Sequence, residues 1–294
     1  CLVGSEMCIR DRGMLIIDES GQAVPQSALG AIYRTRRAVV VGDPLQVEPV
    51  VTIPKVLIDI LADSTCVANA YKVIENSVQT FSDNINEFNG MIGERQVGCP
   101  LVVHRRCIEP MFSISNLISY DNRMFNKTNK KEEYLKPENL FLIKKSGWIN
   151  VEGEENGGKD HFVKNQAERV CQLMEDAVHI YSDLFGTDDK IFIITPFRTV
   201  AESMRKFIIS YFSVKGYDKQ ILSKWTKNCV GTVHTFQGKD ANEVLLVLGC
   251  SNKSAGAMNW VVKKANILNV ACTRAKYRIC LLYTSPSPRD TERS

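Results

Sequence analysis

Short apolar runs that end abruptly at polar residues recur along the chain, at residues 14–17, 38–41, 191–194 and 244–248. Runs of this length that are rich in Val and Ile are typical of strands buried on both faces of a parallel sheet. Stretches with helical periodicity lie between them. This alternation predicts an α/β fold in which the polar residues that follow the strands gather at the carboxyl edge of a sheet, where ligands bind.

The expected helices cover residues 26–33, 54–61, 78–85, 109–120, 165–184 and 259–275, with a further helix after Arg198 and a closing strand from about Arg278. Asn165 is expected to cap the helix that begins there, because its side chain can accept a hydrogen bond from an amide of the first turn. The inner face of that helix carries apolar side chains at helical spacing: Ala167, Val170, Met174, Ala177, Tyr181 and Leu184. The stretch from 62 to 98 is rich in Asn, Ser and Asp and is otherwise expected to form loops.

A boundary between two domains is expected near residues 90–98. We predict that residues 13–95 are the C-terminal part of a first domain and that residues 96–282 form an essentially complete second domain. Residues 1–12 and 283–294 do not continue the periodicity of their neighbours and resemble translated sequencing adapter. We expect them to be a non-native leader and tail, and the chain to be a fragment of a longer protein.

The composition is that of a globular protein, with 44% hydrophobic and 24% charged residues in a chain of 294. The formal charge of +4 is too small to indicate a nucleic-acid partner by itself. None of the ten cysteines stands in a Cys-x-x-Cys spacing, and most lie in apolar surroundings, among them Cys171, Cys250, Cys272 and Cys280. We therefore expect reduced core thiols and a cytoplasmic location, without a zinc site, a disulfide framework or a membrane span.

Two acids directly follow the first strand. Asp18 and Glu19 stand where a Walker B pair would stand, with Asp18 placed to hold Mg²⁺ and Glu19 to activate a water. An exposed acidic pair after a core strand is the alternative interpretation. The second strand leads into a loop that contains Gln46, whose amide can both donate and accept, as sensing a terminal phosphate requires.

Arg105 and Arg106 follow a further short strand. A strand that ends in two arginines suggests a site that binds an anion or a carboxylate. The alternative is two solvated arginines at the end of the strand. Two other features are expected to be structural: the Lys-rich segment 121–137 as a solvated excursion, and Trp148 as a core residue.

Six blocks, in this order and spacing, resemble the motifs of superfamily 1 nucleic-acid helicases, and within them the group related to the nonsense-mediated-decay helicase. They lie at residues 18–23 (motif II), 42–46 (motif III), 104–107 (motif IV region), 195–198 (the Thr-Pro-Phe-Arg block), 231–240 (motif V) and 269–276 (motif VI). The resemblance implies two RecA-like parallel-sheet domains that use ATP and Mg²⁺ to move on single-stranded DNA or RNA, 5′ to 3′. We expect such a motor to be a monomer.

The resemblance also assigns roles to residues at the nucleotide. Asp18 would hold Mg²⁺, Glu19 would polarise the attacking water, and Gln46 would read the γ-phosphate. Arg106 and Arg274 would act as arginine fingers from the second domain. The remaining implied residues are Gly238 and Asp240 beside the nucleotide, Arg105 at the base, and Thr195, Arg198, Thr232 and His234 on the nucleic acid.

The chain departs from the family pattern at two points. Arg105 occupies a position that is usually aromatic, although a guanidinium can also stack on a base. No Gly-rich loop with Gly-Lys-Thr or Gly-Lys-Ser precedes Asp18. We therefore expect this fragment neither to bind ATP tightly nor to hydrolyse it, whereas the longer parent should do both.

The rival interpretation is a non-catalytic helicase-like module that binds nucleic acid or protein. Such a module would need none of the acids and arginines assigned to catalysis. A P-loop transporter or GTPase would leave the blocks after residue 100 without an explanation.

Overall fold

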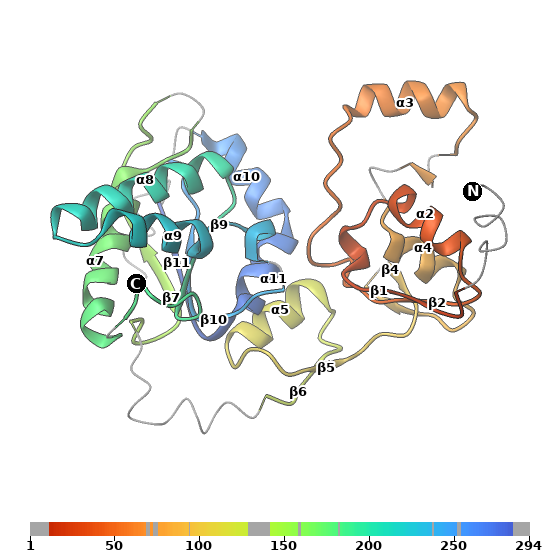
Figure 1. The fold of residues 1–294 in the computed structure, drawn as a ribbon, viewed down its shortest axis with the longest axis horizontal. Helices are drawn as coiled ribbons and strands as arrows, with labels where there is room; N and C mark the ends of the chain where they lie inside the picture. Colours follow the sequence, from red (N-terminus) through yellow and green to blue (C-terminus); the bar gives the residue numbers. More distant parts are fainter. Residues whose placement is uncertain are drawn as a thin grey trace, which may run out of the picture. The chain divides into compact units, whose positions relative to one another are not determined.

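The computed structural model describes residues 12–68, 71–72, 76–93, 95–128, 142–157, 160–181, 183–236, 238–251 and 254–284. Its internal contacts divide the chain into two compact units, which we call unit 1 (Cys1–Val102) and unit 2 (Val103–Ser294). Figure 1 shows the helices and strands of both units. We describe each unit by itself.

Unit 1 contains a small parallel sheet. Strand β1 (Leu15–Ile17) pairs with β2 (Ala38–Val40), and α2 (Pro25–Tyr33) connects them. The strands and the helix lie where the apolar pattern placed them. The expectation that both strands are buried is wrong, since Ile16 is 68% and Val39 44% exposed. Within the described residues no third strand pairs with this sheet, and its faces are largely open.

Helix α4 (Val78–Ile85) supports the loops that follow this sheet. It begins with a capping box at Ser77 and Thr80, and the amide of Val78 donates to the carbonyl of Ala23. A hairpin of β3 (Gly90–Ile92) and β4 (Arg95–Val97), which the sequence did not indicate, follows the helix. Since this hairpin belongs to unit 1, the division between the units falls after Val102.

Helix α3 (Lys55–Ser64) is present as expected, but its apolar side is turned to solvent. Its buried residues are Ile58 and Ala62. The four residues that group on one side in the sequence are 46–71% exposed: Val56, Leu57, Ile60 and Leu61.

Unit 2 is built on a five-stranded parallel sheet in the order β7-β11-β10-β8-β9, which confirms the α/β class. Its strands are β7 (Gly147–Asn150), β8 (Ile191–Thr195), β9 (Val230–Thr232), β10 (Ala241–Val247) and β11 (Ala275–Tyr283). All five residues of β8 are buried, as the apolar run at its centre predicts. A separate pair, β5 (Val103–His104) and β6 (Phe125–Asn126), flanks α5 (Met111–Ser119) in the sequence.

The connections place helices on both faces of the sheet. Helix α7 (Lys164–Ile180) leads from β7 to β8, and α8 (Arg198–Val214) and α9 (Lys219–Cys229) lead from β8 to β9, in the same direction. Helices α10 (Ala255–Lys263) and α11 (Ala265–Arg274) lead from β10 to β11 in the opposite direction. Because crossovers between parallel strands are right-handed, these two groups cover opposite faces.

This arrangement creates a topological switch point at the carboxyl ends of β8 and β10. The two strands are neighbours, and the chain leaves them in opposite directions. In open α/β sheets a ligand crevice forms at such a point. The residues that follow β8 and β10 are therefore placed where ligands commonly bind.

Several local expectations for unit 2 are corrected. The single helix expected over 259–275 is two helices with a break at Lys264. Helix α7 is not capped by Asn165, which is its second residue and donates to the carbonyl of Glu152. Trp148 is 71% exposed, because it lies on β7 at the edge of the sheet. Tyr283 ends β11 and the Thr284 hydroxyl donates to Val151, so the structure places both in the sheet region rather than in a tail.

None of the helices in the described ranges is long and apolar enough to cross a membrane. Most of the Lys-rich segment 121–137 lies outside those ranges; Lys127, which lies inside them, is exposed as expected.

Candidate nucleotide and nucleic-acid sites

The loops after β1 and β2 lock together through two glycines. A Cβ atom on Gly21 would lie 2.7 Å from the carbonyl oxygen of Asp43, and one on Gly42 would lie 2.5 Å from the hydroxyl of Ser20. The Ser20 hydroxyl donates to the carbonyl of Val41 and to Gln79 on α4. Only glycine fits at both positions, and the motif II and motif III loops are thereby held side by side.

Asp18 and Glu19 are exposed at the carboxyl end of β1. Glu19 has a left-handed backbone (φ 52°) and precedes the short 3₁₀ helix η1 (Ser20–Gln22). Such a conformation is uncommon for a non-glycine residue and often marks a functional position. Asp18 Oδ1 accepts the amide of Glu19, and Gln22 donates to Glu19 Oε2. Exposed carboxylate oxygens of this kind fit Mg²⁺, which prefers oxygen ligands.

Gln46 is oriented by Asp43. Its side-chain amide donates to Asp43 Oδ2 at 2.8 Å, while Oδ1 of the same carboxylate accepts the amide of Leu45. Arg95 donates to the carbonyl of Pro44, and burial lowers its pKa. Gln46 therefore sits on a loop whose shape is fixed by an internal carboxylate.

Arg106 directly precedes Cys107, whose thiol is buried in unit 2. Burial raises the pKa of Cys107 to about 12, and the positive charges of Arg106 and Arg274 act against that rise. The amide of Ile108 donates to the carbonyl of Lys276, which ties the motif IV loop to the start of β11. Arg106 is half-buried whereas Arg105 is exposed. The loop that carries Arg106 is thus joined by a backbone hydrogen bond to the segment that follows Arg274.

Arg274 is buried, with an exposed fraction of 1%. Its guanidinium donates to the carbonyl of Phe236 at 3.4 Å and to the hydroxyl of Thr273 at 3.2 Å. An arginine finger is expected to extend from the surface of its own domain toward the nucleotide. Here the side chain is instead held within unit 2 against the 3₁₀ helix η4 (Val233–Phe236) of motif V.

Gly238 and Asp240 lie just before β10, beside the start of β11. Gly238 has φ +75°. Asp240 forms an ion pair with Lys276, with 2.7 Å between Oδ1 and Nζ. Asp240 is therefore engaged by a motif VI residue. Motifs IV, V and VI meet at the amino edge of the sheet.

The residues predicted to touch nucleic acid lie at the opposite, carboxyl edge. Thr195 and Thr232 end the neighbouring strands β8 and β9 and are paired in register. Arg198 and His234 are exposed. Thr195 is only 1% exposed, and its hydroxyl has no hydrogen-bond partner among the described residues. Most buried hydroxyls in folded proteins have a hydrogen-bond partner, so Thr195 is an exception.

One cluster at this edge was missed by sequence reasoning. Glu155, His161 and Cys250 place one ligand atom each within 4.8 Å of one another, a spacing that could hold a metal ion. The structure explains the contacts internally: Glu155 accepts from the amide of Ser251 at 2.7 Å and pairs with His161 at 3.2 Å. Gly249 and Cys250 follow β10 with positive φ, and Cys250 donates its amide to His161.

The pKa of Glu155 lies below its usual value of 4.5. Burial alone would raise it, but hydrogen bonds from Ser251, Ser254 and His161 lower it by more. A depressed carboxyl pKa adds stability above the unfolded-state value, and that stability is lost as the pH falls through the folded value. We expect Glu155→Gln to lower the free energy of unfolding by about 1–2 kcal/mol at pH 7.

The measurement is urea unfolding of both proteins between pH 7 and pH 3.5. The difference between the wild type and Glu155→Gln should shrink below pH 4.5. Glu154→Gln, at the exposed neighbour, should change the stability by less than about 0.5 kcal/mol. A difference that stayed constant over this range would show that the charge of Glu155 does not stabilise the crevice.

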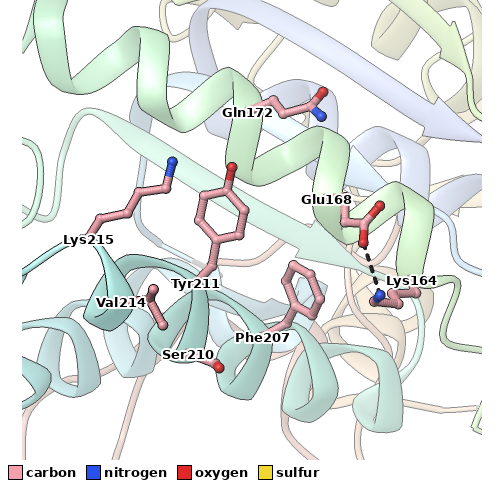
Figure 2. A pocket seen from close by; sticks show the side chains of 8 residues that line it. All are labelled: Lys164, Glu168, Gln172, Phe207, Ser210, Tyr211, Val214 and Lys215. Atoms are coloured by element: carbon pink, nitrogen blue, oxygen red, sulfur yellow. Dashed lines mark ion pairs between the residues drawn. The ribbon is translucent and has the colours of Figure 1, made fainter.

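A pocket of about 440 Å³ lies between α7 and α8, away from all these residues. Figure 2 shows Phe207 and Tyr211 of α8 pointing toward α7, beside the Lys164–Glu168 ion pair. None of the predicted site residues lines it.

Two sets of residues are thus defined by the fold: acids and an amide after the strands of unit 1, and arginines with an Asp–Lys pair in unit 2. Comparison with known proteins identifies the protein family to which the chain belongs. A family profile described as "AAA domain" matches residues 87–285, and a second profile with the same description matches residues 6–53. The chain belongs to this AAA-domain family of superfamily 1 helicases.

The curated relatives are distant and much longer. The chain is 24% identical to mouse "Probable helicase senataxin" over 91% of this chain and 9% of that protein. It is 25% identical to bovine "DNA replication ATP-dependent helicase/nuclease DNA2", over 92% of this chain and 25% of that protein. It is 23% identical to "Uncharacterized ATP-dependent helicase MJ0104" of Methanocaldococcus jannaschii, over 92% of this chain and 35% of that protein. The chain therefore spans between a tenth and about a third of these relatives.

Among solved structures, the C-terminal domain of a possible DNA helicase from a Lactobacillus (strain WCFS1) aligns with a TM-score of 0.34. The identity is 12%, over 63% of this chain and 90% of that one.

Proposed function

We propose that this chain is part of an ATP-dependent helicase or translocase built on two RecA-like domains, which uses Mg²⁺ and moves on single-stranded DNA or RNA. The observation that carries the proposal is the joining of motifs IV, V and VI in unit 2, with Arg274 buried where they meet. Hydrogen bonds from Ile108 to Lys276 and from Arg274 to Phe236, with the Asp240–Lys276 ion pair, connect the three motifs. A domain that only binds has no need to hold Arg274 between these motifs.

Within this proposal each unit contributes one half of the chemistry. In unit 1, Asp18 would hold Mg²⁺, which neutralises phosphate charge when bound; Glu19 would take a proton from water, and Gln46 would orient that water. In unit 2, Arg106 and Arg274 would neutralise charge that develops on the transferred phosphoryl group. Gly238 and Asp240 would line the nucleotide and Arg105 would stack on its base.

Under the same proposal, nucleic acid binds at the carboxyl edge of the sheet in unit 2. Thr195, Arg198, Thr232 and His234 would contact phosphate and sugar, which positions a strand without reading its sequence. Binding of this kind weakens steeply as salt rises, because phosphate contacts release counterions.

The experiment measures the anisotropy of fluorescein-labelled dT15 and rU15 with this chain at several salt concentrations. We expect the affinity to fall as salt rises, and Arg198→Ala to reduce the slope of log K against log[salt] by about 0.7, the contribution of one phosphate contact to a single strand. Lys224→Ala, at an exposed lysine of α9, is the matched control and should leave the slope unchanged. Affinity that did not respond to salt would contradict the proposal.

The described cysteines support a reducing compartment. All eight are free thiols and six of them are buried, at positions where burial raises the pKa of the thiols. Buried thiols of high pKa are inert. The proposal includes a cytoplasmic location, with which reduced thiols are compatible.

The rival function is a clamp that binds nucleic acid without turnover. It predicts the same salt dependence. ATP hydrolysis by the longer protein separates the two, since a clamp shows none that depends on Glu19 or Arg106.

A further inference from the structure

Three aromatic rings form a row at the switch point of unit 2. The ring centroids of His161 and Phe197 are 4.7 Å apart, and those of Phe197 and Trp260 are 5.7 Å apart at an interplanar angle of 33°. His161 lies between β7 and α7, Phe197 is the second residue after β8, and Trp260 lies on α10 after β10. Each ring therefore comes from a segment that follows the carboxyl end of a different strand.

The row is anchored at one end and open at the other. His161 is held by Glu155 and by the amide of Cys250, and Phe197 immediately precedes the first residue of α8. Trp260 is 44% exposed. Large apolar side chains that remain exposed at a ligand crevice are suited to contact with a partner.

The charges around the row suit a polyanion. Arg198 follows Phe197 directly, and its side chain is 88% exposed. Its ion pair with Glu202 at 3.0 Å lies on the helix surface, where such a pair contributes little and can be exchanged for a phosphate. The ammonium of Lys264 lies 5.6 Å from the ring centroid of Trp260, and Lys263 beside it is exposed.

Acids are also present near the row, but their carboxylates are engaged. Glu155 accepts from the amide of Ser251 and pairs with His161, and Asp160 accepts the amide of Phe162. Lys263, Arg198 and the ring of Trp260 supply exposed basic and aromatic groups on these segments. This combination is the one that single-stranded nucleic acid requires, with stacking faces for bases and cations for the backbone.

We propose that Trp260, backed by Phe197, is a stacking platform for one base of a single strand, and that Arg198 and Lys263 bind the flanking phosphates. The inference rests on the proposed nucleic-acid binding of this chain and adds the residues that hold a base. Stacking does not select a base, which fits a motor that must accept any sequence.

The three tryptophans of the chain allow a direct test. Trp225 is 1% exposed, and Trp148 is 71% exposed on the edge strand β7. In a Trp148→Phe background, emission comes from Trp225 and Trp260 alone. We expect dT15 and rU15 to quench this emission, and the quenching to disappear in the double variant Trp148→Phe/Trp260→Phe.

Affinity is measured separately by anisotropy of labelled dT15 and rU15. Trp260→Ala should weaken binding by about 5- to 100-fold, the range for loss of one base–aromatic stack. Trp260→Phe keeps an aromatic face and should stay within about threefold of wild type. Trp148→Ala removes an equally large exposed ring elsewhere and should have no effect. The buried Trp225 reports the folding of each variant.

The outcomes separate this inference from the function on which it rests. Binding that survives Trp260→Ala at wild-type affinity, with quenching retained in the double variant, would overturn the platform while leaving nucleic-acid binding intact. Absence of binding by the wild type at low salt would overturn both. A response to dT15 alone or to rU15 alone would support the platform and identify the sugar that the strand carries.

Discussion

Replacement of Arg106 by alanine is expected to lower kcat for ATP hydrolysis about a thousandfold in a longer protein that carries this chain and binds ATP. An arginine that neutralises charge on the transferred phosphoryl group has an effect of this order. Arg106 is half-buried, and its loop is tied to β11 by the hydrogen bond from Ile108 to Lys276. A loop held in this way does not have to be ordered before its arginine acts on the transition state.

The neighbouring arginine is the matched control. Arg105 is exposed, and its proposed role is to stack on the base. Arg105→Ala should therefore raise KM for ATP and leave kcat within about threefold of wild type. Steady-state ATPase with saturating oligonucleotide measures both constants, and thermal melting checks the folding of the variants. If Arg106→Ala kept kcat within threefold of wild type, the arginine would have no part in the chemistry.

Replacement of Glu243 by alanine is expected to lower the free energy of unfolding by about 3–5 kcal/mol, the cost of removing one partner from a buried charged network. Glu243 is fully buried near the start of β10. Its carboxylate accepts the amides of Leu142 and Ile143 and the hydroxyl of Tyr181. Burial raises its pKa, and these three hydrogen bonds and Arg278 act against the rise.

Alanine at this position would leave two amides and a hydroxyl without an acceptor, in the part of the sheet where Arg278 also donates to Ile143. Urea unfolding followed by the emission of buried Trp225 measures the change. Glu168→Ala removes a carboxylate from an exposed pair with Lys164 on α7 and should cost less than about 0.5 kcal/mol. Equal effects of the two substitutions would show that the buried network contributes nothing specific.

Most helices and the buried strands of unit 2 could be predicted from the sequence, because their signals are local. β8 is an unbroken apolar run, and the inner face of α7 shows clear helical spacing: Ala167, Val170, Met174 and Ala177 are all buried. Trp148 could not be placed by such signals, because its exposure depends on β7 being an edge strand. The role of Glu243 was also invisible, since its partners Leu142 and Ile143 lie about a hundred residues earlier.

The site residues show the same limit. The residue types at the ends of the strands were enough to name candidate positions, whose chemistry stays a prediction. They did not indicate that Arg274 would be buried against Phe236, or that Glu155, His161 and Cys250 would meet at the switch point. Those facts depend on contacts between segments that are distant in the sequence.

The 3₁₀ helix η4 connects Thr232 at the carboxyl edge of the sheet with the residue that holds Arg274. It begins directly after Thr232 at the carboxyl edge, carries the exposed His234, and ends at Phe236, whose carbonyl holds Arg274. Thr235 packs on Gly231, so the turn is pinned to β9 as well. Any movement of Arg274 must therefore either break its hydrogen bond to Phe236 or move the turn with it. Under the proposed function, this turn would connect the nucleotide side of unit 2 with its nucleic-acid side.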